Sequence, residues 1–399
     1  MNVLYFVNRF PKLSESFVIN EIHELEKRGH NIAVFSLREP EIDMTHDEVS
    51  DLDAEVGYLP DPGVRSLLGT PGRWCLDPSV LRSMAHTSGP KAHAGAAYIA
   101  GHCISFVESL DHEIDHIHGH FLNWPKLAAQ YTAERFDVPC TVTAHAYGLY
   151  SDPNMRMLRR LADRCDRVVT ISEYNKRHLE EEVGTDTPVD VVHMGIDPEK
   201  FQPTEETVEN RILTVGRFVE KKGITYGIEA VAEVVEEVPD LEYHIVGSGP
   251  KEAEIRDAIA EHDLEDHVTI LGNVTDEQLI REYDEAEVFL LPCVVAEDGD
   301  RDGIPVVLME AMAMGCVPVS TTVSGIPELV QFGEDRVLVE PMDSAAISDI
   351  LSSIYADASA NKFSKRARRR VIEEYTIGRQ GDSMEKVIQQ SHSSFKDFP

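Results

Sequence analysis

The sequence has 399 residues, of which 42% are hydrophobic and 27% charged, so it has the composition of a soluble globular protein and is too long for one ordinary core. Its 37 basic and 71 acidic residues give a formal net charge of −34, which argues against a general nucleic-acid-binding protein at ordinary salt. The carboxylates are spread along the chain, which is typical of proteins from halophiles, where dense counterions screen the repulsion.

The start of the chain, MNVLYFV, is apolar, but Asn8, Arg9 and Pro11 end the run too early for a signal peptide. No apolar run reaches the length that a membrane-spanning helix needs. The six cysteines are scattered without a CxxC pair, which indicates reduced, buried residues and neither a disulfide framework nor a zinc knuckle. We therefore expect a cytoplasmic protein.

Strands and helices alternate in the first half of the chain. Residues 2–7 predict a strand, and 14–28 predict a helix with Val18, Ile22 and Leu25 on one face. Further strands are expected at 31–37, 115–118, 140–144 and 167–171. The segment 56–95 is irregular and rich in proline and glycine, which favours a surface loop over a mobile excursion above a ligand cleft.

The same alternation restarts after a polar stretch, 197–210, which has two prolines and five acidic residues and which we interpret as a linker. A helix is predicted at 224–238, and strands are expected at 211–215, 241–246, 268–271, 288–291 and 317–320. This alternation indicates parallel sheets with helices on both faces. The sequence therefore predicts an α/β protein of two Rossmann-like, doubly wound domains, 1–196 and 211–379, which face each other across a cleft and bind ligands at the carboxyl ends of their strands.

The stretch DRDGIPVVLMEAMAMG, residues 300–315, carries two carboxylates around a predicted helix at 306–314. Pro305 suits the first turn of that helix, because its missing N–H needs no partner there. The helix would point free backbone N–H groups toward an anion, and Gly303 would let a phosphate come close. Asp302 and Glu310 can each accept two hydroxyl hydrogen bonds, the pattern that sugar diols offer. The alternative is that both carboxylates only make the surface soluble.

The longer stretch DGDRDGIPVVLMEAMAMGCVPVSTTVSGIPELV resembles the donor-site motif of the GT-B glycosyltransferases of retaining family four, the group 1 type, and above all its colanic-acid-type branch. That branch has glutamate at both acidic positions, whereas this chain has Asp302 at the first and Glu310 at the second. The resemblance implies that Asp302 contacts hydroxyls of the transferred sugar as a catalytic residue and that Glu310 binds the ribose. It also places Gly303, Ile304 and Pro305 in the donor site.

Two earlier turns extend the resemblance. VGRFVEKKG is similar to the family's phosphate clamp, which implies that Arg217 and Lys222 hold the donor diphosphate and stabilise the leaving group in catalysis without a metal. IVGSGPKEAEI is similar to the next turn, in which Gly247 and Gly249 approach the nucleotide; from the residues alone, a plain tight turn is the alternative. NRFPKLSESFVINEI, ISEYNKRHL and VVHMGIDPEKF are similar too, so the resemblance covers nearly the whole chain.

Two histidine-containing stretches lie in the first half. In DHIHGHF, His116, His118 and His120 would share one face of a strand and could ligate zinc in a metal-dependent hydrolase, but no carboxylate ligand follows. The resemblance instead implies that His120 is a catalytic-site residue that hydrogen-bonds the donor sugar and that His118 is structural at the strand end. In TVTAHAYGLY it implies that His145 lies near the acceptor, although Gly148 stands where the branch often has aspartate.

The resemblance implies a retaining, hexosyltransferase-type enzyme with a nucleotide-sugar as substrate and with no metal or other cofactor. The first domain would hold a glycan or lipid-linked acceptor for cell-surface polysaccharide or glycoconjugate synthesis, and the second would hold the donor. Residues 380–399 would cross back to the first domain. Three alternatives stay open: a nucleotide-sugar epimerase of the same fold, a weakened sugar-nucleotide-binding protein and the zinc hydrolase.

The basic run KFSKRARRR, residues 362–370, stands out from the acidic background. It could bring the protein to the inner face of an anionic membrane as a peripheral contact. The alternative, which we prefer, is the solvated face of a helix that leads into 371–375.

Overall fold

The computed structural model describes residues 1–12, 15–40, 52–61, 90–151, 153–204, 207–330, 337–356 and 360–396. Its backbone contacts divide the chain into two compact units. Unit 1 comprises Met1–Leu149, Pro153–His193 and Ile377–Pro399, and unit 2 comprises Tyr150–Asp152 and Met194–Thr376. Within the described ranges, no helix combines the length and the apolar character that a membrane crossing demands.

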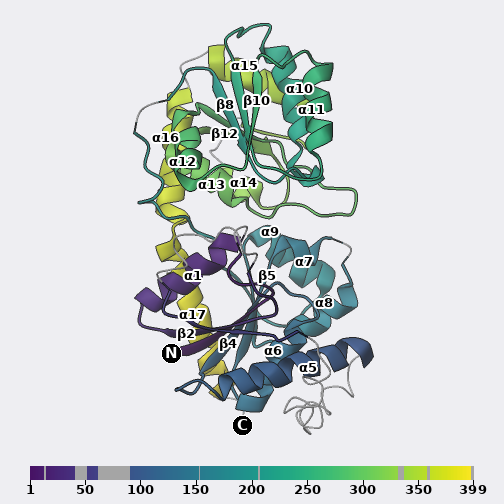
Figure 1. Ribbon diagram of the computed structural model, residues 1–399, viewed down its shortest axis with the longest axis vertical. Helices are drawn as coiled ribbons and strands as arrows, with labels where there is room; N and C mark the ends of the chain where they lie inside the picture. Colours follow the sequence, from purple (N-terminus) through teal and green to yellow (C-terminus); the bar gives the residue numbers. More distant parts are fainter. Residues whose placement is uncertain are drawn as a thin grey trace. The chain divides into compact units, whose positions relative to one another are not determined.

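Unit 1 is built on a parallel sheet with the strand order β3-β2-β1-β4-β5-β6-β7. Figure 1 labels β2, β4 and β5 of this sheet. The strands are β1 (Asn2–Val7), β2 (Asn31–Ser36), β3 (Glu55–Tyr58), β4 (His116–His120), β5 (Cys140–Ala144), β6 (Arg167–Thr170) and β7 (Val189–Val191). Because the chain order reverses between β1 and β4, the sheet is doubly wound. Ligands of such sheets bind beyond the carboxyl ends of the strands at this switch point.

The helices of unit 1 are α1 (Ser16–Lys27), α5 (Pro90–Val107), α6 (Lys126–Phe136), α7 (Ala146–Leu149), α8 (Met155–Ala162), α9 (Glu173–Arg177) and α17 (Ile377–Lys396), and a π-helical segment (His178–Val183) follows α9. Alternate side chains of β1 point to opposite faces of the sheet. Tyr5 packs in one apolar cluster with Ile22 of α1 and Ile388 of α17, so these two helices, far apart in the sequence, share a face. Phe6 points the other way, toward Phe35 and the ammonium of Lys126.

Unit 2 is built on a second parallel sheet, with the order β10-β9-β8-β11-β12-β13. Its strands are β8 (Arg211–Val215), β9 (Glu242–Val246), β10 (Val268–Gly272), β11 (Val288–Leu291), β12 (Val317–Thr321) and β13 (Leu338–Val339). Its helices are a short 3₁₀ turn (Glu220–Lys222), α10 (Ile224–Val234), α11 (Glu252–Glu261), α12 (Asp276–Glu285), α13 (Val306–Met314), α14 (Ile326–Val330), α15 (Ser344–Ala356) and α16 (Ala360–Glu374). The chain order reverses between β8 and β11, so this sheet is doubly wound as well.

Many predicted elements coincide with those of the structure. The strands predicted at 2–7, 140–144, 211–215 and 288–291 and the helix predicted at 306–314 have the predicted bounds. The sequence did not predict β3, β7 and β13, which are edge strands of four, three and two residues. Strands this short show too little alternation to be recognised from their pattern.

Two predictions for unit 1 were wrong. The segment 56–95 is not irregular throughout, because β3 covers Glu55–Tyr58 and α5 starts at Pro90, while residues 62–89 lie outside the described ranges. The strand predicted at 115–118 runs from His116 to His120. His118 therefore lies within β4, and His120 ends it.

The stretch predicted as a linker, 197–210, falls in unit 2, where Phe201 is buried and two backbone N–H groups of the stretch are hydrogen-bonded. The backbone N–H of Thr204 donates to the Asp284 carboxylate at 2.8 Å, and the N–H of Val208 donates to the Glu285 carbonyl at 2.8 Å. Both partners lie at the end of α12. The last segment, Ile377–Pro399, is part of unit 1.

The basic run at 362–370 forms part of α16, and several of its arginines bond within unit 2. Arg368 donates to the carbonyl oxygens of Phe201 and Ala313. Arg370 donates to the carbonyl oxygen of Glu328 at 2.7 Å. Arg369, in contrast, is exposed and pairs with Glu373 one turn along the helix. The run is thus a helix face that is partly solvated and partly engaged by its own unit.

Candidate functional site

The turn after β8 places the predicted clamp residue Lys222 at the carboxyl edge of the unit 2 sheet. Lys222 ends the 3₁₀ turn, and Gly223 after it has φ +62°, where a Cβ would lie 2.0 Å from the carbonyl oxygen of Pro292. Only glycine fits this close approach. The Lys222 side chain then runs back over Gly216, whose missing Cβ would lie 3.2 Å from Lys222 Cε. Gly216 thus leaves room for the Lys222 side chain at the strand end, and Gly223 allows the turn that follows the lysine to approach Pro292.

Lys222 and Asp302, 80 residues apart in the sequence, form an ion pair with Nζ 2.6 Å from Oδ2. Lys221 joins them, with its Nζ 3.4 Å from Asp302 Oδ1 and 3.0 Å from Asp300 Oδ2. The thiol of Cys293 lies 3.5 Å from Asp302 Oδ2. Asp302 is therefore no solubility residue: its side chain is only 15% exposed and has two lysines beside it.

Charge dominates the protonation of this cluster. Burial would raise the pKa of Asp302, but the charges of Lys222 and Lys221 and a hydrogen bond from Lys222 outweigh it and hold the pKa at about 2. Burial likewise would lower the pKa of Lys222, and the Asp302 carboxylate outweighs it, so that the pKa is raised. Both groups are thus charged at neutral pH. A nearly buried ion pair of this kind provides fixed charges rather than mobile ones.

Helix α13 begins beside Asp302. Pro305 occupies the N-cap with φ −70° and ψ 125°, one residue before the first turn that the sequence predicted for it, and no side chain caps the helix. The N-cap residue thus offers no side-chain acceptor to the first N–H groups of α13, and no other described side chain accepts from them. Gly303 and Ile304 are buried just before it, and the carbonyl of Gly303 accepts from the N–H of Gly325 at 3.1 Å, which ties this turn to the start of α14.

Glu310 lies on the second turn of α13 and is half-buried. The hydroxyl of Tyr283, from α12, donates to Glu310 Oε2 at 2.9 Å. Burial, with the Glu310 charge, raises the pKa of Tyr283, so the phenol keeps its proton and stays a donor. The tyrosine thus occupies one carboxylate oxygen and orients the side chain.

Arg217 and the two glycines of the next turn complete the predicted donor residues. Arg217 is exposed, and its charge is close enough to Lys222 to oppose the charged form of that lysine. Gly247 and Gly249 follow β9 with φ +136° and +157°. A Cβ would lie 1.9 Å from the carbonyl oxygen of Gly216 at the first and 2.6 Å from that of Phe218 at the second. The glycines are therefore required by contact between two neighbouring turns, whatever else they bind.

In unit 1, the predicted histidines meet a carboxylate that the sequence analysis had not found. Glu21 of α1 is buried at 4% exposure, and its Oε1 lies 3.3 Å from His120 Nε2 and 3.9 Å from His118 Nε2. His120 Nδ1 lies 3.0 Å from Nε2 of His145, which directly follows β5. Because β4 and β5 are parallel neighbours, His120 and His145 lie together at the carboxyl edge of the sheet.

Three of these groups are close enough to bind a metal ion. Ligand atoms of Glu21, His118 and His120 lie within 4.8 Å of one another, so the objection that no carboxylate accompanies the histidines does not hold. Both ring nitrogens of His118 are already engaged, however: Nδ1 lies 2.8 Å from Thr141 Oγ1 and Nε2 lies 3.0 Å from Thr143 Oγ1. A metal would have to displace the Thr143 hydroxyl. We therefore interpret the group as a hydrogen-bonded cluster and not as a set of metal ligands.

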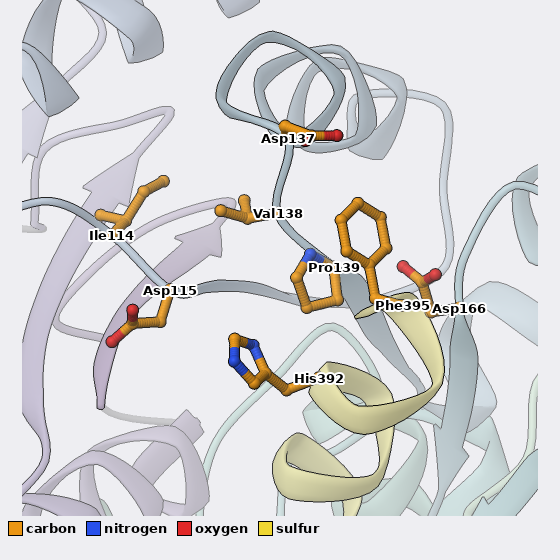
Figure 2. Close-up of a pocket in the computed structure, with 8 residues that line it drawn as sticks. All are labelled: Ile114, Asp115, Asp137, Val138, Pro139, Asp166, His392 and Phe395. Atoms are coloured by element: carbon orange, nitrogen blue, oxygen red, sulfur yellow. The ribbon is translucent and has the colours of Figure 1, made fainter. Parts of the chain in front are cut away.

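Figure 2 shows a cavity of about 720 Å³ in unit 1, and none of these histidines is among the residues that line it. Asp115 and Asp166, which line it, directly precede β4 and β6, so the cavity is at the amino-terminal edge of the sheet. Their carboxylates accept from the backbone N–H groups of Asn2 and Cys140, at 2.7 Å each. Both carboxylates are thus hydrogen-bonded to backbone at the starts of strands, and the cavity is not part of the candidate site.

Sequence reasoning missed several residues of both clusters. Lys221 is adjacent to the predicted Lys222, and only the fold shows that both lysines meet Asp302. Glu21 stands between Val18 and Leu25 on the apolar face of α1, and a carboxylate on such a face could have been noticed. Lys126 is also buried; it donates to Asn8 at 2.9 Å, and burial lowers its pKa to about 7.

Comparison with known proteins agrees with this geometry. Family models match residues 14–200 (Glycosyltransferase Family 4) and residues 196–370 (Glycosyl transferases group 1). The amylovoran biosynthesis glycosyltransferase AmsK of Erwinia amylovora is 44% identical over 41% of this chain and 41% of its own length. The putative colanic acid biosynthesis glycosyltransferase WcaL of Salmonella typhimurium is 29% identical over 97% of this chain and 100% of its own length.

Among solved structures, Alr3699/HepE of Anabaena in complex with UDP and glucose matches with a TM-score of 0.71 at 15% identity, over 97% of this chain and 99% of that one. The two family matches adjoin and together span residues 14–370. The chain therefore belongs to the group 1, family 4 glycosyltransferases, and it has the GT-B fold with two Rossmann-like sheets.

Proposed function

We propose that the protein transfers a sugar from a nucleotide-sugar to a hydroxyl of a glycan or lipid-linked acceptor, with retention at the anomeric carbon. The Lys222–Asp302 pair beside the uncapped start of α13 carries this proposal. Fixed cations and free backbone N–H groups suit a diphosphate, and a carboxylate suits sugar hydroxyls. The HepE complex with UDP and glucose, which has the same fold, supports a donor of this kind.

In the proposed reaction, the bond between the sugar C1 and the phosphate oxygen breaks while the acceptor oxygen bonds to C1 from the same face. Arg217, Lys222 and the start of α13 stabilise the charge that develops on the leaving diphosphate. The acceptor proton passes to the departing phosphate oxygen, so no protein base is needed. Glu310 binds the ribose and Gly247 and Gly249 approach the nucleotide. The unit 1 histidines act at the donor sugar and the acceptor, His145 by direct contact and His120 through His145, because both ring nitrogens of His120 face protein groups.

The names of the relatives support polysaccharide synthesis at the cell surface as the wider role. None of the relatives named above is an epimerase or a hydrolase, so we propose no second function.

The net charge of −34 supports adaptation to high salt, and assays should therefore be run in molar salt. The cytoplasmic location of the protein and the contact of residues 362–370 with a membrane remain predictions.

The proposal is tested by incubating the protein with UDP-, GDP- and ADP-sugars labelled with ¹³C at C1, together with a short glycan and its lipid-linked form. We expect one nucleotide to support transfer, with one nucleoside diphosphate released per bond formed and with the donor's anomeric configuration kept in the product. EDTA should leave the rate unchanged, because lysine and arginine replace a metal at the diphosphate. An inverted product would contradict retention, and turnover of the donor without an acceptor would indicate an epimerase.

A further inference from the structure

Three buried side chains of unit 1 adjoin one another, and the reaction proposed above gives no role to one of them, Glu21. Glu21 of α1 is next to His120 at the end of β4, with Oε1 3.3 Å from Nε2, and His120 is next to His145 after β5, with Nδ1 3.0 Å from Nε2. All three are less than 7% exposed. This inference rests on the proposed function, because it concerns how the histidines assigned to the sugar and the acceptor are prepared.

Glu21 is held as a carboxylate. Its Oε1 accepts from the Tyr5 hydroxyl at 2.7 Å and its Oε2 accepts from the Gln380 amide at 2.8 Å. Burial would raise the pKa of Glu21, but the neighbouring His120, with His118 and Tyr5, lowers it to about 2. A buried carboxylate is stabilised by a neighbouring cation, and in the part of the chain that the structure describes no lysine or arginine pairs with Glu21. In that part of the chain, only the imidazoles beside it can supply the charge.

His120 is that imidazole. It lies nearer to Glu21 than His118 does, and burial lowers the pKa of His118 well below its ordinary value. The Nε2 of His120 has no hydrogen-bond partner in good alignment, and the carboxylate oxygen is the acceptor nearest to it in the described structure. A lone pair there would repel that oxygen, so Nε2 carries a proton. With a second proton on Nδ1, His120 balances the charge of Glu21.

The charge of His120 decides the state of His145. An imidazolium donates from both nitrogens, so His120 Nδ1–H donates to His145 Nε2, and His145 must keep its own proton on Nδ1. Burial and the His120 charge lower the pKa of His145, so its ring is neutral. Besides Tyr5, Glu21 and His118, the buried ammonium of Lys126 acts on this pair, and it too disfavours a second cation.

We infer that Glu21 is a positioning residue that keeps His120 charged and thereby fixes His145 as an N–H donor to an oxygen of the substrate, a hydroxyl or phosphate oxygen. In the described structure, His145 Nδ1 has no hydrogen-bond partner and is not among the enclosed polar atoms, so its proton is available. His145 is then not a general base. This agrees with a transfer in which the departing phosphate takes the acceptor proton.

The test is the ¹⁵N NMR spectrum of the protein with ¹⁵N-labelled histidine rings, near pH 7 and in EDTA, with resonances assigned from His120→Gln and His145→Gln. We expect His120 to be protonated on both nitrogens and His145 to carry its proton on Nδ1. In Glu21→Gln, which keeps the size of the side chain but not its charge, His120 should become neutral and His145 should lose its single tautomer. Tyr5→Phe is the matched control: it removes a hydrogen bond to the same carboxylate but no charge, so both histidines should keep their states.

Several results would overturn the inference. These are a neutral His120 or an Nε2-protonated His145 in the unaltered protein, unchanged ring shifts in Glu21→Gln, and a bound metal that EDTA removes with a change at His118 and His120. The unaltered protein alone decides the first of these even if Glu21→Gln does not fold. Because the spectrum needs no substrate, it can fail or succeed separately from the transferase proposal.

With an active assay, Glu21→Gln should lower kcat roughly 10- to 100-fold with little change in the donor KM. A loss of this size is typical when a group that orients a functional side chain is removed.

Discussion

Arg217→Ala is expected to lower turnover by roughly 10²- to 10³-fold, the cost of removing one preorganised charge that stabilises a leaving group. Its stability should stay within about 0.5 kcal/mol of the unaltered protein, because Arg217 is exposed. Steady-state rates with saturating donor and thermal unfolding measure the two effects. Arg256→Ala is a suitable control, since Arg256 is an exposed arginine of unit 2 whose acidic partner, among the residues that the structure describes, is Glu252 on the same helix.

Lys222→Ala should lose activity to a similar extent but should also destabilise the protein by about 1–3 kcal/mol, because it leaves the enclosed Asp302 carboxylate without its nearest partner. Lys221, 3.4 Å from the other carboxylate oxygen, limits this loss. The structure therefore separates two clamp residues that the sequence alone treated alike. A rate near that of the unaltered protein in either variant would remove the diphosphate clamp from the account.

Glu310→Gln is expected to raise the donor KM roughly 10- to 100-fold with a smaller change in kcat, because a charged hydrogen bond to the ribose is lost and that contact persists through the reaction. Stability should hardly change, since the Tyr283 hydroxyl can still donate to the amide oxygen. Steady-state kinetics with varied donor provide the measurement. A donor KM equal to that of the unaltered protein would show that Glu310 does not bind the ribose.

Asp302→Asn should instead lower kcat, because in the proposed donor site the carboxylate would face a sugar that gains positive character as the bond breaks. It should also lower stability, since it removes the carboxylate that pairs with Lys222 and leaves Lys221 with Asp300 as its acidic partner among the described residues. Asp302→Glu restores the residue usual in the colanic-acid-type branch and keeps the charge, so activity should persist or the donor preference should change. If Asp302→Asn, Asp302→Glu and Glu310→Gln all left the kinetics unchanged, the donor site proposed here would be wrong.

The sequence predicted those helices and strands whose bounds are set by residues close to them in the chain. The helix at 306–314 has a proline before it and a glycine after it, and it has the predicted bounds. The residues around Asp302 that we propose to bind the donor likewise lie in one continuous stretch, which is why a resemblance could point to them. What the sequence did not reveal depends on residues that meet only in the folded chain, such as Glu21 and Gln380, which are 359 positions apart and share a hydrogen bond.

The histidines illustrate the same limit. The sequence placed His116, His118 and His120 on one face of a strand. The structure confirms this, because His116 and His118 both contact Thr141 Oγ1 and the ring of His118 lies 4.9 Å from that of His120. It could not show which ring would meet a carboxylate, because that depends on how α1 crosses the sheet. The end of β4 was predicted two residues early, so His118 was assigned to the strand end that His120 occupies.

The central claim, that the Arg217 and Lys222 cations hold the diphosphate of a nucleotide-sugar, is tested most directly by calorimetric titration with UDP, GDP and ADP and with the corresponding monophosphates in molar salt. For the nucleotide that binds, the diphosphate should bind roughly 10- to 100-fold more tightly than the monophosphate. One or two additional hydrogen bonds to a charged group contribute a gain in affinity of about this size. In Arg217→Ala this difference should largely disappear, while monophosphate binding stays as it was. Equal binding of the two nucleotides by the unaltered protein, or an undiminished difference in Arg217→Ala, would contradict the account.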